Sequence, residues 1–204
     1  MALPFASRLQ LDSVTSRVLT AKPSTQPTHP PPTPPLLASV NAASALALLH
    51  NHPAFQNLQP LLVKNTIIPT PSTSWLVTEA QSLAQANNNA SVEYRSVAVA
   101  VPMGPFTSTV VTTSAFVDTD DGLIIVFQAP LGLHGVNRFR VVSEGEGGGL
   151  VLSEEARLVG FRLMMPFVVK TELESHGEAG RAFGRKLVEM NGAGGKGEGE
   201  IAGK

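Results

Sequence analysis

The sequence contains no cysteine and carries almost no net charge. Without Cys the chain can form neither a disulfide framework nor a thiolate metal site, which fits a reducing compartment. Its formal net charge of −1 gives no electrostatic basis for binding nucleic acid or an anionic membrane. No apolar run is long enough to span a membrane, and no secretory signal pattern opens the chain. We expect a cytoplasmic protein without an integral membrane segment, and Arg8, Arg17 and Lys22 leave a mitochondrial presequence as the minor alternative.

The sequence also lacks the common catalytic motifs. Its two Gly-rich runs lack the strand-to-helix context and the Gly-Lys-Ser/Thr of a phosphate loop. A Gly-x-Ser-x-Gly elbow, a zincin motif and a Cys–His pair are all missing. His50 and His52 lie two residues apart with no third ligand in sight, so we expect no metal site and no cofactor.

The 204 residues, of which 43% are hydrophobic, suit a single domain with tails. We expect residues 1–38 to hold a possible first strand and a Pro-rich loop, because the Pro residues at 23–35 remove backbone donors. The domain itself should span residues 39–191. Residues 192–204 are Gly, Lys and Glu and should be disordered, and residues 23–35 should be mobile.

Residue types and turn signals predict an α+β order. Two short helices, at 40–49 with Ser39 or Asn41 as cap and at 54–61, should follow the first strand. The strands are expected at 62–68, 75–81, 92–101, 107–117, 123–129, 137–143 and 150–159. Asp118–Gly122 is the clearest hairpin turn, and local turns throughout this region favour an antiparallel sheet over parallel crossovers.

The spacing of apolar residues at 166–190 predicts a long amphipathic helix. Its apolar stripe, at helical spacing, consists of Val169, Leu173, His176, Gly180, Phe183, Leu187 and Met190. Pro166 suits the first turn and Asn191-Gly192 a stop, while Glu172 falls elsewhere on the wheel, where it can stay hydrated. Gly177, Gly180 and Gly184 each cost about 1 kcal/mol against Ala, so the helix either packs very closely or leaves room for something.

Two polar residues fall on predicted inward faces. The period of two in the strand at 150–159 places Glu154 on the same, more apolar face as Leu152 and Leu158. Glu154 is either hydrated near a sheet rim or buried in a cavity, where it would orient a ligand. His176 is either a core residue whose ring nitrogens are hydrogen-bonded within the protein, or a site residue that contacts a ligand or acts as a general acid or base.

The element order is similar to the helix-grip fold of the START and birch-pollen-allergen (SRPBCC) superfamily. Within that superfamily, the sequence resembles an uncharacterised family of filamentous-fungal proteins over roughly residues 40–190. The residues that carry this resemblance are His50-Asn51-His52, Leu58-Gln59-Pro60-Leu61, the Asp118–Gly122 turn, Ala129-Pro130-Leu131-Gly132 and Arg138-Phe139-Arg140-Val141. The resemblance implies a curved antiparallel sheet of about six to eight strands wrapped on the long C-terminal helix around a cavity. It brings no known activity, so no catalytic residue is inherited.

The apolar inner faces and the helix glycines, together with this fold, favour a monomeric carrier or sensor. Its ligand would be an apolar small molecule such as a lipid, sterol or polyketide. The expected ligand-binding residues are Phe116, Phe127, Phe139, Leu152, Glu154, Leu173, His176, Gly180 and Phe183. One alternative is a cyclase or dehydratase that uses Glu154 and His176 as acid and base. Another is an interaction module with a filled core.

Overall fold

The protein is described here from a computed structural model, which defines residues 8–18, 41–72, 74–103, 105–143 and 150–193. The strands are β1 (Arg8–Val18), β2 (Leu62–Ile67), β3 (Val92–Met103), β4 (Phe106–Thr119), β5 (Gly122–Gln128), β6 (His134–Ser143) and β7 (Leu150–Phe161). The helices are α1 (Ala42–His50), α2 (His52–Gln56), α3 (Trp75–Ala86) and α4 (Met165–Ala193), with a short 3₁₀ helix η2 (Pro130–Gly132). The Pro-rich stretch at 23–35 and residues 194–204, both expected to be mobile, lie outside the described residues.

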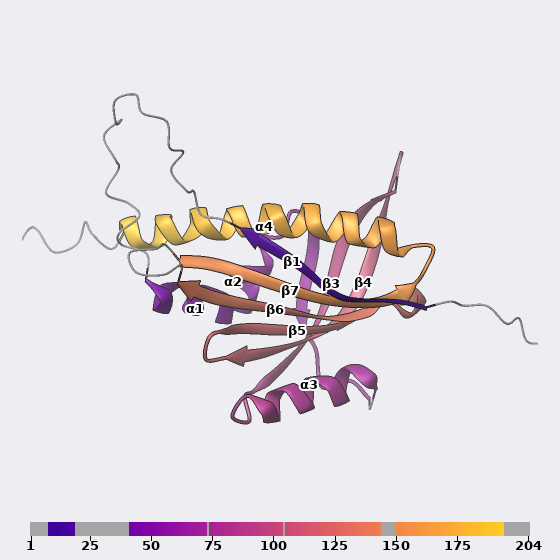
Figure 1. The fold of residues 1–204 in the computed structure, drawn as a ribbon, viewed down its shortest axis with the longest axis horizontal. Coiled ribbons are helices and arrows are strands. Elements are labelled where there is room, and N and C mark those ends of the chain that lie inside the picture. The colour runs from indigo at the N-terminus through magenta and orange to yellow at the C-terminus, as the bar shows by residue number, and fades with distance from the viewer. Residues whose placement is uncertain (1–7, 19–40, 73, 104, 144–149, 194–204) are drawn as a thin grey trace, which may run out of the picture.

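The strands form one curved, antiparallel sheet in the order β1-β7-β6-β5-β4-β3-β2. Strands β2 to β7 lie in the sheet in chain order. The connections from β3 to β7 are local, as the turn signals predict, whereas the connection from β2 to β3 contains α3. The N-terminal strand β1 instead pairs with β7, with Arg8 opposite Phe161. The long helix α4 crosses the concave face of this sheet (Figure 1). The architecture is therefore α+β and helix-grip-like, as expected.

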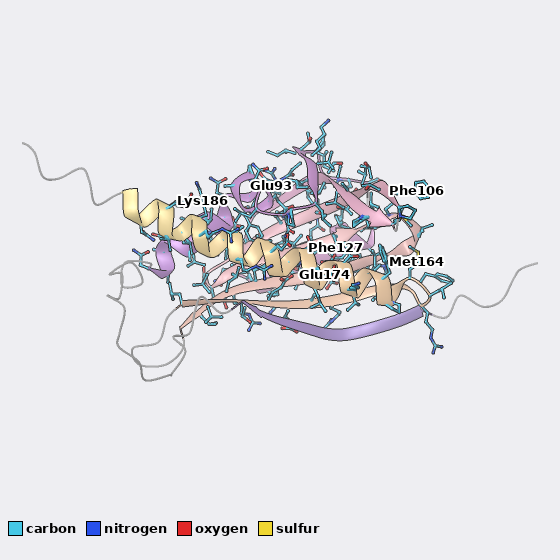
Figure 2. The ribbon with its side chains drawn as sticks, turned by 90° about the horizontal axis from the view of Figure 1, so that it is seen from above. Glu93, Phe106, Phe127, Met164, Glu174 and Lys186 are labelled. Carbon is cyan, nitrogen blue, oxygen red and sulfur yellow. The ribbon has the colours of Figure 1, made fainter. Side chains whose placement is uncertain are left out.

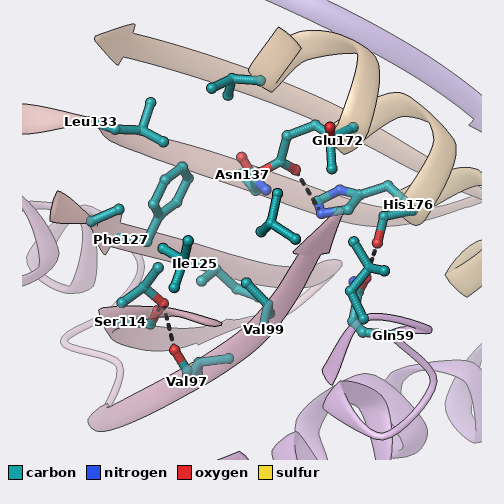
Figure 3. Close-up of a pocket in the computed structure, with 18 of the residues that line it drawn as sticks. Gln59, Val97, Val99, Ser114, Ile125, Phe127, Leu133, Asn137, Glu172 and His176 are labelled. Atoms are coloured by element: carbon teal, nitrogen blue, oxygen red, sulfur yellow. Dashed lines mark hydrogen bonds and ion pairs between the residues drawn. The ribbon is translucent and has the colours of Figure 1, made fainter. Parts of the chain in front are cut away.

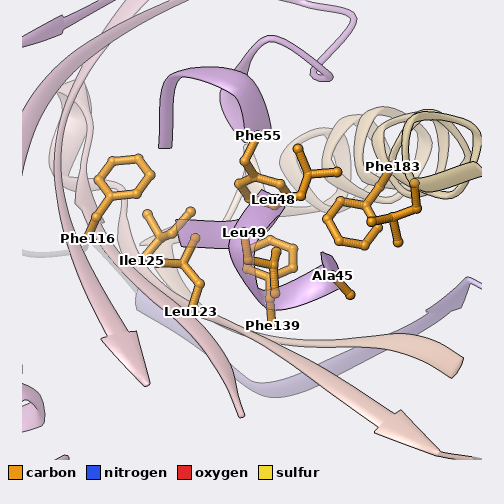
Figure 4. Packing of buried hydrophobic residues seen from close by; sticks show 10 residues of the cluster. Ala45, Leu48, Leu49, Phe55, Phe116, Leu123, Ile125, Phe139 and Phe183 are labelled. Atoms are coloured by element: carbon orange, nitrogen blue, oxygen red, sulfur yellow. The ribbon is translucent and has the colours of Figure 1, made fainter. Parts of the chain in front are cut away.

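The concave face holds one large apolar core, to which three helices contribute. The helix α1 inserts Leu48 and Leu49, and α2 adds Phe55, whose ring meets Phe139 of β6 edge-on at 5.1 Å between centroids. Phe183 of α4 also lies edge-on to Phe55, at 6.1 Å between ring centroids (Figure 4). Burial of such side chains contributes about 1.5–3 kcal/mol each relative to their exposure, so this cluster fixes all three helices on one face.

The start of α1 lies where the sequence predicts it. Asn41 is the N-cap, and its side-chain oxygen accepts a hydrogen bond from the backbone N–H of Ser44 at 2.7 Å. Asn51 caps α2 in the same way through the N–H of Ala54. The two short helices after the first strand are thus confirmed, although α2 is shorter and begins earlier than expected.

The strand expected at 75–81 is wrong, because this segment is the helix α3 on the convex face of the sheet (Figure 1). Its buried residues Leu76, Val77, Ala80 and Ala84 are spaced for one helical face. They cover outward-facing residues of β4 and β5 such as Val117 and Val126. Strand β5 is therefore buried on both faces, which explains its continuous apolar sequence.

The helix α4 matches the predicted helix but differs at both ends of its stripe. Phe183 and Leu187 are buried, whereas Leu173 and Met190 are each 41% exposed. The helix also passes the expected stop at Asn191-Gly192, since Asn191 donates a side-chain hydrogen bond to the carbonyl of Leu187 and contacts Ser44 of α1. None of the helices that the structure describes is long and apolar enough to cross a membrane.

Candidate functional site

A cavity of about 270 Å³ lies between the concave face of the sheet and α4. Alternate residues of β3 line it, namely Val97, Val99 and Val101, because a period of two sends every second side chain to the same face. Phe127 and Ile125 of β5 continue the apolar surface (Figure 3). The lining is therefore mostly hydrocarbon, as in small-molecule sites.

The cavity opens at the end of the molecule where the β3–β4 hairpin, η2 and the start of α4 come together. Four of its lining residues, Met103, Leu131, Phe161 and Phe167, are also exposed to solvent. Figure 2 shows Met164, another lining residue, at this end, whereas Lys186 lies toward the opposite end of α4. The mouth is thus rimmed by large apolar side chains.

The residues predicted to bind a ligand fall into three groups. The large cavity is lined by four of them: Phe116, Phe127, Phe139 and His176. Two smaller cavities, of about 20 and 10 Å³, are bordered by Leu152, Glu154, Leu173 and Gly180. Phe183 packs in the apolar core. The prediction therefore combined the cavity wall with the layer of residues directly behind it.

His176 on α4 lies between two carboxyl groups. Its Nδ1 is hydrogen-bonded to Oε1 of Glu154 on β7, and its Nε2 lies 2.7 Å from Oε2 of Glu172, one turn earlier on α4. Glu154 is 6% exposed, so it is buried and not hydrated at a rim. Glu172 and His176 line the large cavity, while Glu154 stands behind His176.

These contacts set the charges of His176 and Glu172. Burial alone would lower the pKa of His176, but the charges of Glu172 and Glu154 and their hydrogen bonds raise it well above its usual value. Burial would likewise raise the pKa of Glu172, yet the charge of His176 and its contact outweigh this and lower it. At neutral pH the imidazole is therefore a cation and Glu172 an anion, and both ring N–H groups of His176 are directed at carboxylates.

Asn137 of β6 lies 5% exposed on the cavity wall, and its Oδ1 is buried without a hydrogen-bond partner. In the described part of the chain, no side chain or backbone group satisfies this amide oxygen. Figure 3 shows the carboxamide at the end of the pocket where Glu172 and His176 lie. A buried acceptor that lacks a partner costs about 1–3 kcal/mol, so this position is a candidate contact for a bound molecule.

Two hydroxyl groups of the cavity are engaged in hydrogen bonds within the protein. The hydroxyl of Ser175 donates to Oε1 of Gln59 at 3.2 Å, and the hydroxyl of Thr112 donates to the carbonyl of Val97 at 3.3 Å. Among the lining residues that the structure describes there is no Lys and no Arg. The charged side chains of the lining are therefore Glu172 and His176, which lie beside the neutral amides of Gln56, Gln59 and Asn137.

A second polar cluster lies outside this cavity, between α2 and the sheet. His52 is hydrogen-bonded through Nδ1 to Glu93 at 2.6 Å and through Nε2 to Asp118 at 2.9 Å. Arg95, 3% exposed, donates from Nε to the same Glu93 oxygen at 2.6 Å and from its guanidinium to Asn65 at 3.2 Å. The charged groups pair with one another, which indicates a structural role, although the Nδ2 of Asn65 is buried without a hydrogen-bond partner.

In 8–18, 41–72, 74–103, 105–143 and 150–193, no group of three or more His, Asp or Glu residues is arranged to hold a metal ion. His50 and His52 both approach Asp118, but the Nε2 of His50 is 4.0 Å from the Asp118 Oδ1, beyond hydrogen-bond distance. The Nε2 of His50 instead contacts the backbone carbonyl of Gly122 at 2.8 Å, which ties the end of α1 to the β4–β5 turn.

Two residues of the site were missed in the sequence, each for a recognisable reason. Glu172 was expected to stay hydrated, but its spacing of four from His176 places both on neighbouring turns of the same helix face. Asn137 was placed only at the start of a strand. Its parity with Phe139 puts both on the inner face, and this signal was sufficient to find it.

Comparisons with known proteins bear on the family of this chain. No curated protein has a matching sequence. The solved crystal structure of TTHA0849 from Thermus thermophilus is similar, with a TM-score of 0.48 and 11% identity over 90% of this chain and 99% of that one. The model of the family described as "Domain of unknown function (DUF7053)" matches residues 25–189. Because this match spans most of the sequence, the chain belongs to the DUF7053 family.

Proposed function

We propose that the protein binds a small, largely apolar molecule in the cavity between the sheet and α4. The observation that carries this proposal is a cavity of about 270 Å³ with a hydrocarbon lining and a few polar groups at one end. An interaction module would be expected to fill this volume, because interiors otherwise pack as densely as organic crystals. The unfilled space therefore favours a binding protein.

The volume limits the size of the ligand. A cavity of about 150 Å³ holds benzene, so about 270 Å³ corresponds to roughly ten enclosed non-hydrogen atoms. A compact polyketide-like molecule or a short chain fits this estimate. A sterol or a long-chain lipid would extend through the mouth past Leu131 and Phe161.

Catalysis by Glu154 and His176 has less support. Both nitrogens of His176 face carboxylates, and Glu154 stands behind the imidazole instead of lining the large cavity. A general base needs a free nitrogen within hydrogen-bond reach of the substrate. The same triad suits a fixed polar wall against which a ligand is oriented.

Membership of the START and birch-pollen-allergen superfamily, and of its filamentous-fungal branch, is part of this proposal. Its support is the curved antiparallel sheet around α4 and the residue patterns that resemble that family. Fold alone does not establish a ligand, so the proposal must be tested at the cavity.

The test fills the cavity and measures uptake of naphthalene, a neutral fluorescent probe of suitable size. Val99→Phe places a ring in the cavity, whereas Val111→Phe adds the same atoms at a position that is 52% exposed and outside the lining. We expect naphthalene binding to be lost in Val99→Phe and retained in Val111→Phe. Equal binding by both variants, or no binding by the unaltered protein, would contradict the proposal.

Native mass spectrometry of protein purified from its own host provides an independent measurement. A co-purified small molecule should be present in the unaltered protein and absent from Val99→Phe. Its mass would also test the size limit set by the cavity volume.

A further inference from the structure

Carboxyl groups set the negative charge at the polar end of the cavity. Two carboxyl groups, Glu154 and Glu172, surround one imidazole, and Glu172 reaches the cavity surface. No Lys or Arg contributes to the lining within the described residues. A negatively charged group placed here would meet Glu172 in a poorly solvated site, where like charges repel strongly.

The cationic group at the cavity is already paired. Both ring nitrogens of His176 face carboxylates, and the hydroxyls of Ser175 and Thr112 donate to Gln59 and to the carbonyl of Val97. A ligand carboxylate would therefore lose its hydration and meet only neutral amide donors, those of Gln56, Gln59 and Asn137, beside the charge of Glu172.

Two buried acceptors of the lining residues have no hydrogen-bond partner in the described part of the chain, Oδ1 of Asn137 and Oε2 of Glu172. The Glu172 oxygen forms an ion pair with His176, whereas Asn137, which is 5% exposed, has no partner of either kind for its Oδ1. An amide oxygen accepts hydrogen bonds only, so a ligand satisfies it by supplying an O–H or N–H group.

We propose that the cavity takes a compact apolar ligand whose polar group is a hydrogen-bond donor without negative charge. A hydroxyl, an amide N–H or an ammonium group has this chemistry, and a carboxylate such as a fatty-acid anion does not. The donor contacts Asn137 Oδ1 beside Glu172, and the hydrocarbon part lies along Val97, Val99 and Phe127 toward the mouth. This inference rests on the proposed binding function and names the ligand class of the same site.

The test compares three naphthalenes of similar size by fluorescence titration at pH 7. They are 2-naphthol, which donates a hydrogen bond; 2-methoxynaphthalene, which does not; and 2-naphthoate, which is an anion. We expect 2-naphthol to bind about tenfold or more tightly than either of the others, because only 2-naphthol satisfies the open acceptor. Equal binding of 2-naphthol and 2-methoxynaphthalene, or tightest binding of 2-naphthoate, would overturn the inference and leave the binding function intact. Failure of all three to bind would overturn the binding function itself.

Two variants test whether Asn137 causes the preference for 2-naphthol over 2-methoxynaphthalene. In Asn137→Leu the affinity for 2-naphthol should fall to that for 2-methoxynaphthalene, whose own affinity should not decrease. Thr112→Val is the matched control, because the Thr112 hydroxyl lines the same cavity but already donates to the carbonyl of Val97. Loss of the preference in the control, or its persistence in Asn137→Leu, would place the donor contact elsewhere.

Discussion

His176 of α4 and Glu154 of β7 lie 22 residues apart in the sequence and meet through Nδ1 and Oε1 behind the wall of the cavity. The contact joins the long helix to the sheet at the point where the cavity changes from apolar to polar. Since Glu172 holds the other nitrogen, the orientation of the imidazole is fixed from both sides. This triad gives the protein a specific dependence of stability on pH.

The pKa of His176 is raised in the folded state, so its contribution to stability is complete below its unfolded value of about 6.5 and is lost as pH rises through the folded pKa. The pKa of Glu172 is lowered, so its contribution is present above about 4.5 and is lost as pH falls through the folded pKa. We expect the triad to stabilise the fold most between these two pH values. Chemical denaturation across the pH range measures this.

The reference for that measurement is the double variant Glu154→Leu with His176→Leu, which removes the buried pair together. The difference in unfolding free energy between the two proteins should shrink as pH rises well above 6.5. A difference that stays constant from about pH 6 to about pH 10 would contradict the assignment of a charged His176.

Gly180 borders a cavity of only about 10 Å³, next to Phe55 and Phe139. The sequence favours free space at this glycine, because Phe183 one turn later could supply the packing. A volume of about 10 Å³ cannot hold a leucine side chain, so the structure favours close packing instead. We expect Gly180→Leu to lose about 1–3 kcal/mol of stability through overpacking, measured by thermal unfolding. The control is Gly177→Leu, because an added Cβ there meets only the Arg181 guanidinium at 3.8 Å. A stable Gly180→Leu protein would show that the helix can move away from the sheet.

Gly122 closes the β4–β5 hairpin against β6. A Cβ at this position would lie 1.8 Å from the backbone oxygen of Phe139, so no side chain fits without moving the strand. We expect Gly122→Ala to destabilise the protein by more than about 3 kcal/mol, beyond an ordinary surface substitution. Urea denaturation measures the loss, and an unfolding midpoint equal to that of the unaltered protein would show that the turn has an alternative backbone path.

The pair of Glu93 and Arg95 should respond asymmetrically to substitution. The Arg95 side chain is 4% exposed and that of Glu93 is 33% exposed, so Glu93→Leu leaves a buried cation without its main partner. We expect Glu93→Leu to cost about 3–5 kcal/mol and the double variant Glu93→Leu, Arg95→Leu to cost less. Additive losses in this double-mutant cycle would show that the two residues act independently.

Much of the fold can be predicted from local patterns. The period of two placed Glu154 and Phe139 on inner faces, and the helical stripe placed His176 and Phe183 against the sheet, because these periods follow from backbone geometry alone. Asn41 was one of two expected caps, and its side chain makes the capping bond.

The incorrect predictions arose where a helical and a strand period compete in one segment, or where the residue that a side chain contacts is distant in the sequence. The α3 segment was assigned to a strand because residues 75–81 alternate passably, but its buried residues Leu76, Val77, Ala80 and Ala84 follow the helical period. The role of Glu172 depends on His176, four residues later on the same helix, and on the cavity that both residues line. The open acceptor of Asn137 depends on which groups fail to reach it, and no local pattern reports such an absence.

The pairing of β1 with β7 has a consequence for synthesis of the chain. Arg8 lies opposite Phe161, so the first strand has no partner until almost the whole domain has left the ribosome. Strands β2 to β6 can form their hairpins in order as they emerge, because each pairs with its neighbour in the sequence. Contacts between distant segments form slowly, since a long loop must close before they stabilise anything. The N-terminal strand is therefore the last to join the sheet, and until then the edge of β7 is open to pairing with another nascent copy.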